Sequence, residues 1–144
     1  MKNNPIVVSV FIPSVTKEKV WEALLTPSWI QKWNHASDDW ETTTVSVDLR
    51  IGGRYKAHMQ AKDLSFGFDF ETMFTEIKPH ESYTYVMDEV NREVKVELIE
   101  QKVGILVKET FDPEDENSLE LQQQGWQAIL DNLKIELLKV KNGR

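Results

Sequence analysis

The stretch RYKAHMQAKDLSFGFDFE, residues 54–71, decides the fold class, because apolar and polar residues alternate on both sides of a turn signal at Lys62-Asp63. Side chains of a strand point alternately to its two faces, so this period of two predicts two strands with one covered face and one wet face. The short connection predicts that the strands pair antiparallel as a hairpin. The covered face of this hairpin is predicted to carry Tyr55, Ala57, Met59, Phe66, Phe68 and Phe70.

The same period of two extends over the middle of the chain, from Glu41 to Phe111. Turn-forming residues divide this segment into short strands, and they stand at Gly52-Gly53, Lys62-Asp63, Pro79-His80, Val90-Asn91 and Lys102-Val103-Gly104. The pattern predicts an antiparallel meander with one face to cover. Beyond the first hairpin, the predicted inward residues are Tyr83, Tyr85, Met87, Val94, Val96, Leu98, Ile105, Val107 and Phe111.

One long helix is predicted from Ser118 to Lys141, with Asn117 or Ser118 as its N-terminal cap. Its apolar residues recur every three or four positions, which gives a helix one apolar face. At 1.5 Å per residue it would be roughly 35 Å long, enough to cross a sheet of several strands. The predicted apolar face consists of Leu119, Trp126, Ile129, Leu130, Leu133, Leu137 and Val140.

The first part of the chain predicts a strand and two short helices. Ile6 to Ile12 is rich in β-branched residues and is followed by Pro13, which cannot donate to a sheet. Thr16 is placed to cap the first helix, and Thr26-Pro27 to begin the second. The whole order predicts an α+β domain spanning residues 1–144, with the long helix packed on the sheet.

Composition excludes several classes of partner and site. With 17 Lys+Arg against 24 Asp+Glu the net charge is -7, the wrong sign for a polyphosphate or an anionic membrane surface. There is no cysteine, which excludes disulfides, thiolate metal sites and a cysteine nucleophile. The apolar run near the start is too short for a signal peptide or a membrane span. These features predict a cytoplasmic protein without nucleic acid or membrane insertion.

Several blocks of the sequence, in a fixed order, carry a resemblance to a known family. They are VWEAL at 20–24 with Pro27, Ile30 and Trp33, then GGRY at 52–55, FDF at 68–70 with TEIKP at 75–79, and QGW at 124–126 with Leu130, Leu133 and Lys134. The chain resembles the SRPBCC, or START-like, superfamily. Within it the resemblance is to the bacterial group related to the C-terminal domain of the activator of the 90-kDa heat-shock chaperone ATPase.

The resemblance implies a helix-grip fold, in which a curved antiparallel sheet wraps around the C-terminal helix and two short helices close one end. In that fold an elongated apolar cavity between the helix and the sheet commonly takes a hydrophobic small molecule. The family supplies no catalytic set for this branch, and neither a cofactor nor a metal is expected. The predicted lining of the cavity is Trp33, Trp40, Tyr55, Met59, Phe66, Phe68, Phe70, Tyr85, Met87, Glu109, Trp126, Ile129, Leu130 and Leu133.

The aromatic residues of this set allow two interpretations. Large rings stack on planar apolar ligands, but they also fill protein cores. Two of the three histidines are not expected to have a chemical role. His58 is on the solvent-facing side of its strand and His80 is in a turn, so both are expected to be solvated. His35 lies in a loop with Asp38 and Asp39 that could rim the cavity, but adjacent aspartates point apart and do not predict a metal site.

Glu109 is the acid of most interest, because it shares the inward phase of Ile105, Val107 and Phe111. An inward carboxyl would be desolvated, and its pKa would rise, so that it could bind a ligand hydroxyl or amine or act as a general acid. A β-bulge near the end of the strand would instead turn it to solvent.

Three classes of function remain open from the sequence. The first is a binding or carrier protein for a lipid-like, polyketide-like or planar aromatic molecule. The second is a protein-interaction module of the chaperone-activator type. The third is a cyclase-like or hydrolase-like enzyme, for which no acid and base pair stands out in the sequence.

Overall fold

The computed structural model of the protein describes residues 4–87 and 91–143, with side chains described as far as Lys139. Within these residues one antiparallel sheet of seven strands has the order β1-β7-β6-β5-β4-β3-β2. The strands are β1 (Ile6–Pro13), β2 (Trp40–Val47), β3 (Arg54–Ala61), β4 (Gly67–Lys78), β5 (Ser82–Met87), β6 (Arg92–Gln101) and β7 (Gly104–Phe111), and the helices are α1 (Lys17–Leu25), α2 (Pro27–Trp33) and α3 (Leu119–Gly143).

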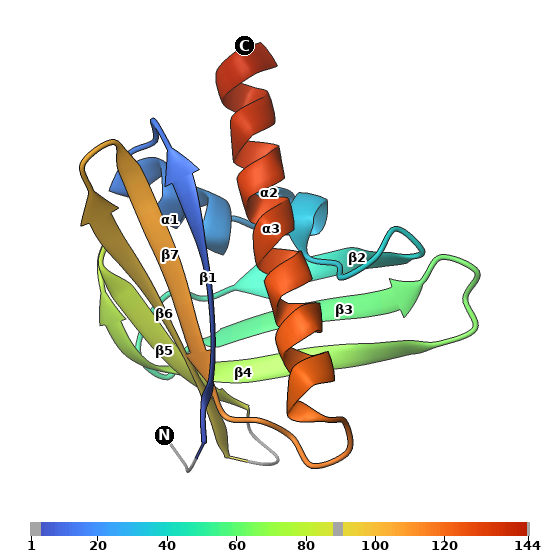
Figure 1. Ribbon diagram of the computed structural model, residues 1–144. Coiled ribbons are helices and arrows are strands. Elements are labelled where there is room, and N and C mark those ends of the chain that lie inside the picture. Colours follow the sequence, from blue (N-terminus) through green and yellow to red (C-terminus); the bar gives the residue numbers. More distant parts are fainter. Residues whose placement is uncertain (1–3, 88–90, 144) are drawn as a thin grey trace.

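The sheet is strongly curled, and α3 crosses its concave side, as Figure 1 shows. The short helices α1 and α2 lie between β1 and β2 in the chain and cover one end of the curl (Figure 1). The predicted α+β helix-grip fold is confirmed. Its core joins the inner faces of β1, β6 and β7 to one face of α3, where Leu130, Leu133 and Leu137 are buried.

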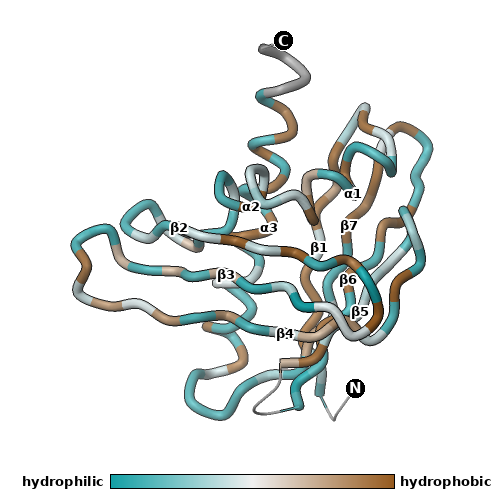
Figure 2. The backbone as a smooth tube through the Cα atoms, turned by 180° about the vertical axis from the view of Figure 1, so that it is seen from behind, coloured by the Kyte–Doolittle hydropathy of each residue, from teal (hydrophilic) through white to brown (hydrophobic). Residues whose placement is uncertain are grey.

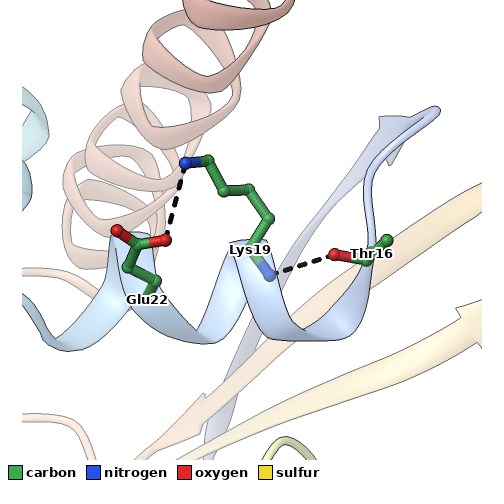
Figure 3. A network of polar contacts seen from close by, with 3 residues as sticks. All are labelled: Thr16, Lys19 and Glu22. Carbon is green, nitrogen blue, oxygen red and sulfur yellow. Dashed lines mark hydrogen bonds and ion pairs between the residues drawn. The ribbon is translucent and has the colours of Figure 1, made fainter.

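The predicted cap of the first helix is confirmed. The Thr16 hydroxyl accepts a hydrogen bond from the backbone N–H of Lys19 at 3.1 Å, and the Lys19 ammonium lies 3.5 Å from Glu22 (Figure 3). The prediction for Thr26 holds in part: α2 begins with Pro27 at its first position, but the Thr26 side chain makes no capping bond. Proline suits that position because the first N–H of a helix has no partner inside the helix.

The connections between strands follow the predicted turn signals. Gly52 has a φ of 85°, a conformation that favours glycine, and a Cβ on Gly53 would lie 2.1 Å from the Asp48 carbonyl oxygen. This close approach allows the turn between β2 and β3 to fold back on itself. His80 occupies the turn between β4 and β5 with a φ of 65°. Of the predicted turn Val90-Asn91, Val90 lies outside the described residues.

The long helix begins one residue later than predicted, and Ser118 is its cap. Its hydroxyl accepts a hydrogen bond from the backbone N–H of Leu121 at 3.0 Å. The prediction that Leu119 belongs to the covered face is wrong, since this side chain is 52% exposed in the first turn, before the helix reaches the sheet. Val140 lies beyond the residues whose side chains are described.

The prediction that Phe66 and Phe68 lie on a covered face is wrong as well. Phe66 precedes β4 and is 73% exposed, and Phe68 is 50% exposed. Both have the inward phase, but they lie at the far end of the β3–β4 hairpin, which extends beyond the helices (Figure 1). Figure 2 shows apolar residues, in brown, at this far end. The two rings lie 6.4 and 6.0 Å from the Trp40 ring, so they form a small aromatic group on the surface.

Candidate functional site

The inner face of the sheet carries several polar side chains, and four of them are Tyr55 of β3, Tyr83 and Tyr85 of β5, and Glu109 of β7. We call these four the tyrosine–glutamate cluster. The three tyrosine residues are buried, and their rings contact one another, with centroids 5.5 Å apart for Tyr55 and Tyr85 and 6.0 Å apart for Tyr83 and Tyr85. Tyr83 was absent from the predicted lining, although its inward phase two residues before Tyr85 could have identified it.

The register of β7 places Glu109 on the inner face. It stands opposite Val8 of β1 and Val96 of β6, which are both buried, and β7 pairs with both neighbours without a register shift. No bulge therefore turns Glu109 away, and its neighbours along the strand on the same face, Val107 and Phe111, are fully buried. Glu109 therefore lies on the inner face of the sheet, and its side chain is partly exposed.

The cluster has no hydrogen-bond partners in the described part of the chain, whether for its three hydroxyls or for its carboxyl. In that same part of the chain, every side-chain nitrogen or oxygen that is completely shielded from solvent has a hydrogen-bond partner. The four polar groups therefore keep surface that a water-sized molecule can reach, although they lie inside the fold. Unpartnered polar groups on such a surface can bind water or the polar group of a ligand.

Burial changes the titration of this cluster. Desolvation raises the pKa of Glu109 to about 7, because the charged carboxylate is poorly solvated beneath the helix. Desolvation is also the main cause that raises the pKa of each of the three tyrosines, and the negative charge of Glu109 adds to it in all three. Glu109 stands opposite Val96 of β6, and Val96 stands opposite Tyr83 of β5, so the carboxyl and the tyrosines lie on the same face of neighbouring strands.

A second feature is a pocket of about 250 Å³ at the end of the inner face near α2, which we call the rim pocket. Trp40, Met59 and Phe68 line it from the sheet, and Ile129 lines it from α3. The loop after α2 completes it with Asn34, His35, Ala36 and Ser37, and Glu41 of β2 also contributes. Its lining is mostly apolar, with a few polar groups at the edge, which is typical of small-molecule sites.

Hydrogen bonds hold the loop of the rim pocket in place. The Asn132 side chain of α3 donates to the His35 carbonyl at 2.7 Å, and the Thr42 hydroxyl donates to the Asn34 carbonyl at 2.6 Å. The Asn34 amide also donates to the Met59 sulfur at 3.4 Å. The loop is thus fixed to both walls, the helix and the sheet.

The inner faces of β3 and β4 join the rim pocket to the tyrosine–glutamate cluster. Along β3 the inward residues run from Met59 in the rim pocket through Ala57 to Tyr55 in the cluster. Phe70 stands opposite Ala57, is partly buried, and contacts the rings of Tyr55 and Tyr85. An apolar strip of wall therefore leads from the edge of the molecule to the polar groups inside.

The remaining predicted lining residues are mainly core residues. Trp33 is buried, and its Nε1 donates to the Ala23 carbonyl at 2.9 Å, so its polar edge is already paired. Trp126 stacks on Phe111 with ring centroids 3.9 Å apart. Met87, near the end of β5, accepts a contact from the Arg92 guanidinium at 3.5 Å. Leu130 and Leu133 are buried in the core between α3 and the sheet.

Among the described residues, His58, His80, Asp38 and Asp39 lie outside the tyrosine–glutamate cluster and the rim pocket. His58 pairs with Asp69 at 2.7 Å on the outer face, and His80 packs its ring 5.8 Å from the Trp21 ring. Asp38 and Asp39 are exposed and do not line the rim pocket. Across the described residues, no three His, Asp or Glu side chains are grouped as a metal would require. No helix among the same residues is long and apolar enough to cross a membrane.

Comparison with known proteins connects this geometry to a family. The model of the family described as "Activator of Hsp90 ATPase homolog 1-like protein" matches residues 14–137. This stretch runs from the end of β1 to the buried part of α3, so it includes the tyrosine–glutamate cluster and the rim pocket. No protein with a curated description matches the chain.

Solved structures of bacterial proteins share the fold. The solution structure of the AHSA1-like protein from Aeromonas hydrophila is 42% identical, with a TM-score of 0.84 and 94% of each chain covered. A protein from Cytophaga hutchinsonii is 34% identical, with a TM-score of 0.81 and coverage of 99% of this chain and 97% of the other. A protein from Nitrosomonas europaea, 20% identical with a TM-score of 0.80 over 97% of each chain, shows the same fold.

Proposed function

We propose that this chain, which belongs to the family of Activator of Hsp90 ATPase homolog 1-like proteins, binds a hydrophobic small molecule between its sheet and α3. The SRPBCC fold of the family suggests a ligand-binding or an interaction domain. The observation that favours a ligand is the tyrosine–glutamate cluster, four interior polar groups without hydrogen-bond partners in the described chain.

The cost of this cluster supports the proposal. A carboxyl that is buried without a partner destabilises the folded protein when it ionises, and so does a buried hydroxyl without a hydrogen bond. A filled, purely apolar core would avoid both costs. In a protein that binds a ligand between sheet and helix, these polar groups can form hydrogen bonds to the ligand and orient it. The burial of apolar surface against the surrounding walls supplies most of the affinity.

The rim pocket supplies an entrance in this proposal. Its apolar lining lies at the edge of the molecule, and the inward strip through Ala57 and Phe70 leads from it to the cluster. A molecule with a lipid-like, polyketide-like or planar aromatic body would lie along this strip. Its polar end would reach the tyrosine hydroxyls and Glu109.

A neutral apolar dye tests the proposal. Nile red is expected to bind the native protein at one saturable site, and Ile129→Trp is expected to weaken this binding by about tenfold or more, because the larger ring narrows the rim pocket. Ile135→Trp is the matched control. Ile135 lies on the same helix but is 49% exposed, so its replacement should change affinity by less than about twofold.

The result can count against the proposal. Circular dichroism and an unfolding curve establish that the Ile129→Trp protein is folded. Dye binding that appears only in partly denaturing conditions would assign it to a loosened core instead of a native site. Equal affinity in both variants would show that the dye does not enter through the rim pocket.

A second candidate function is a protein-interaction module, and the exposed aromatic group at the far end of the β3–β4 hairpin favours it. The Trp40 ring contacts Phe66 and Phe68 there, and Leu64 is exposed in the same hairpin. Exposed apolar groups of this kind often mark contacts with other proteins. By the name of the family, the partner would be a chaperone ATPase of the Hsp90 type.

An ATPase assay separates this candidate from the first. If the hairpin end binds the chaperone, the wild-type protein should raise the ATPase rate and Phe66→Ser should remove most of the increase, because the exposed ring is lost. Ile129→Trp should leave the increase unchanged. No effect of the wild-type protein on the rate would count against the chaperone as partner.

A further inference from the structure

We infer that the ligand of the tyrosine–glutamate cluster is an organic cation, an apolar or planar aromatic body that carries a protonated amine, with the amine on Glu109. The inference rests on the proposed function, since it names the class of ligand for the same interior site. It follows from the charge and hydrogen-bonding capacity of the groups around Glu109.

The first step is that Glu109 has no counter-charge among the described residues. Its neighbours on the inner face of β1, β6 and β7 are aliphatic or aromatic, and the facing side of α3 presents Trp126, Ile129 and leucines. Of the groups that face it, those that titrate are the three tyrosines, which are neutral at pH 7. Burial alone accounts for the altered titration of Glu109, with no contribution from a cation.

Arg92 of β6 has the inward phase, but its guanidinium contacts other groups than Glu109. Arg92 stands opposite Met87 at the end of the sheet, and its Nε donates to the Asp112 carbonyl at 3.0 Å. Its Nη1 lies 3.5 Å from the Met87 sulfur. The guanidinium is therefore held at the end of the sheet and does not neutralise Glu109.

The second step is that the surroundings suit a cation. A carboxylate has four acceptor sites and no donor, and each tyrosine oxygen can accept as well. Rings of Tyr55, Phe70, Phe74, Tyr83 and Tyr85 contact one another. Tyr83 and Glu109 stand opposite the same residue of β6, Val96, from its two sides, so these rings lie on the same inner face as the carboxyl. Ring faces attract ammonium groups. An ammonium group has three hydrogen-bond donors and a positive charge that would neutralise the Glu109 carboxylate. A ligand hydroxyl has one donor and no charge.

Three probes with one ring system test this inference: 2-naphthylmethylamine, 2-naphthylmethanol and 2-naphthoic acid. At pH 8 the amine is expected to bind the protein about tenfold or more tightly than the alcohol, a difference of about 1.4 kcal/mol. The acid should bind most weakly, because its charge would lie against that of Glu109. Calorimetry or displacement of Nile red gives the three affinities.

The matched variants are Glu109→Gln and Glu71→Gln. Glutamine keeps the shape of Glu109 without its charge, so the amine should lose its advantage and bind within about threefold of the alcohol. Glu71 is exposed on β4, and its replacement should leave the preference intact. The preference of the wild-type protein should also fall between pH 8 and pH 5 as Glu109 takes up a proton, while the Glu109→Gln protein should show no such fall.

Each outcome has a separate meaning. If Nile red binds but the alcohol or the acid binds as tightly as the amine, the site exists and the cation assignment is overturned. If the amine is preferred equally in the Glu109→Gln protein, another group provides the charge and the assignment to Glu109 is overturned. If neither the dye nor any probe binds, the proposed function itself fails, and Nile red thus separates the two failures.

Discussion

Replacing Phe111 by alanine is expected to lower the free energy of unfolding by about 3–5 kcal/mol, the usual cost of truncating a buried aromatic ring. Phe111 is fully buried at the end of β7, opposite Ile6 of β1 and Val94 of β6. Its ring stacks on Trp126 with centroids 3.9 Å apart and nearly parallel planes. The substitution removes a stacked ring contact that joins α3 to β7. Urea denaturation measures the loss.

Phe66→Ala is the control for this prediction. The same side chain is removed, but Phe66 is 73% exposed at the far end of the β3–β4 hairpin. Its loss should change stability by less than about 0.5 kcal/mol, as is usual for surface positions. If the two variants were equally stable, Phe111 would not hold α3 to the sheet and the packing of the helix described above would be wrong.

The contrast between these phenylalanines explains what the sequence could predict about the fold. A period of two assigns each residue to a face of a strand, and Phe66, Phe68 and Phe111 were all assigned to the inner face. Whether a face is covered depends on how far the helices reach, and alternation carries no information about that. The order of elements, the turns and the covering helix were therefore predictable, while the exposed end of the hairpin was not.

The candidate site was predictable to a similar extent. The phase of β7 predicts that Glu109 faces inward, but the sequence does not exclude a bulge, because a bulge depends on how both neighbouring strands pair. The rim pocket could not be predicted from the sequence, because it depends on the conformation of the loop after α2. Asn34 and His35 are placed there by bonds to Thr42 and Asn132, which belong to other elements, and no local pattern predicts such bonds.

Replacing Glu109 by glutamine is expected to stabilise the unliganded protein at high pH and to remove part of its pH dependence. The pKa of Glu109 rises from 4.5 to about 7 in the folded protein. Below pH 4.5 the group is protonated in both states and has little effect on stability. Between pH 4.5 and 7 the unfolded chain releases this proton and the folded protein keeps it, so stability falls as pH rises. Above pH 7 the full cost of the buried charge is present.

The size of this effect follows from the two pKa values. At 1.36 kcal/mol for each pH unit between them, ionised Glu109 costs the folded protein about 3 kcal/mol, and the Glu109→Gln protein would avoid most of that cost because glutamine is neutral at every pH. Chemical denaturation of both proteins from about pH 4 to pH 9 should therefore give stabilities that agree at the acidic end and diverge above about pH 5. Glu71→Gln, on the outer face, should follow the wild-type curve within about 0.5 kcal/mol. Parallel curves for the wild-type and Glu109→Gln proteins would place the carboxyl in solvent, and the tyrosine–glutamate cluster would then lose the charge on which the cation assignment depends.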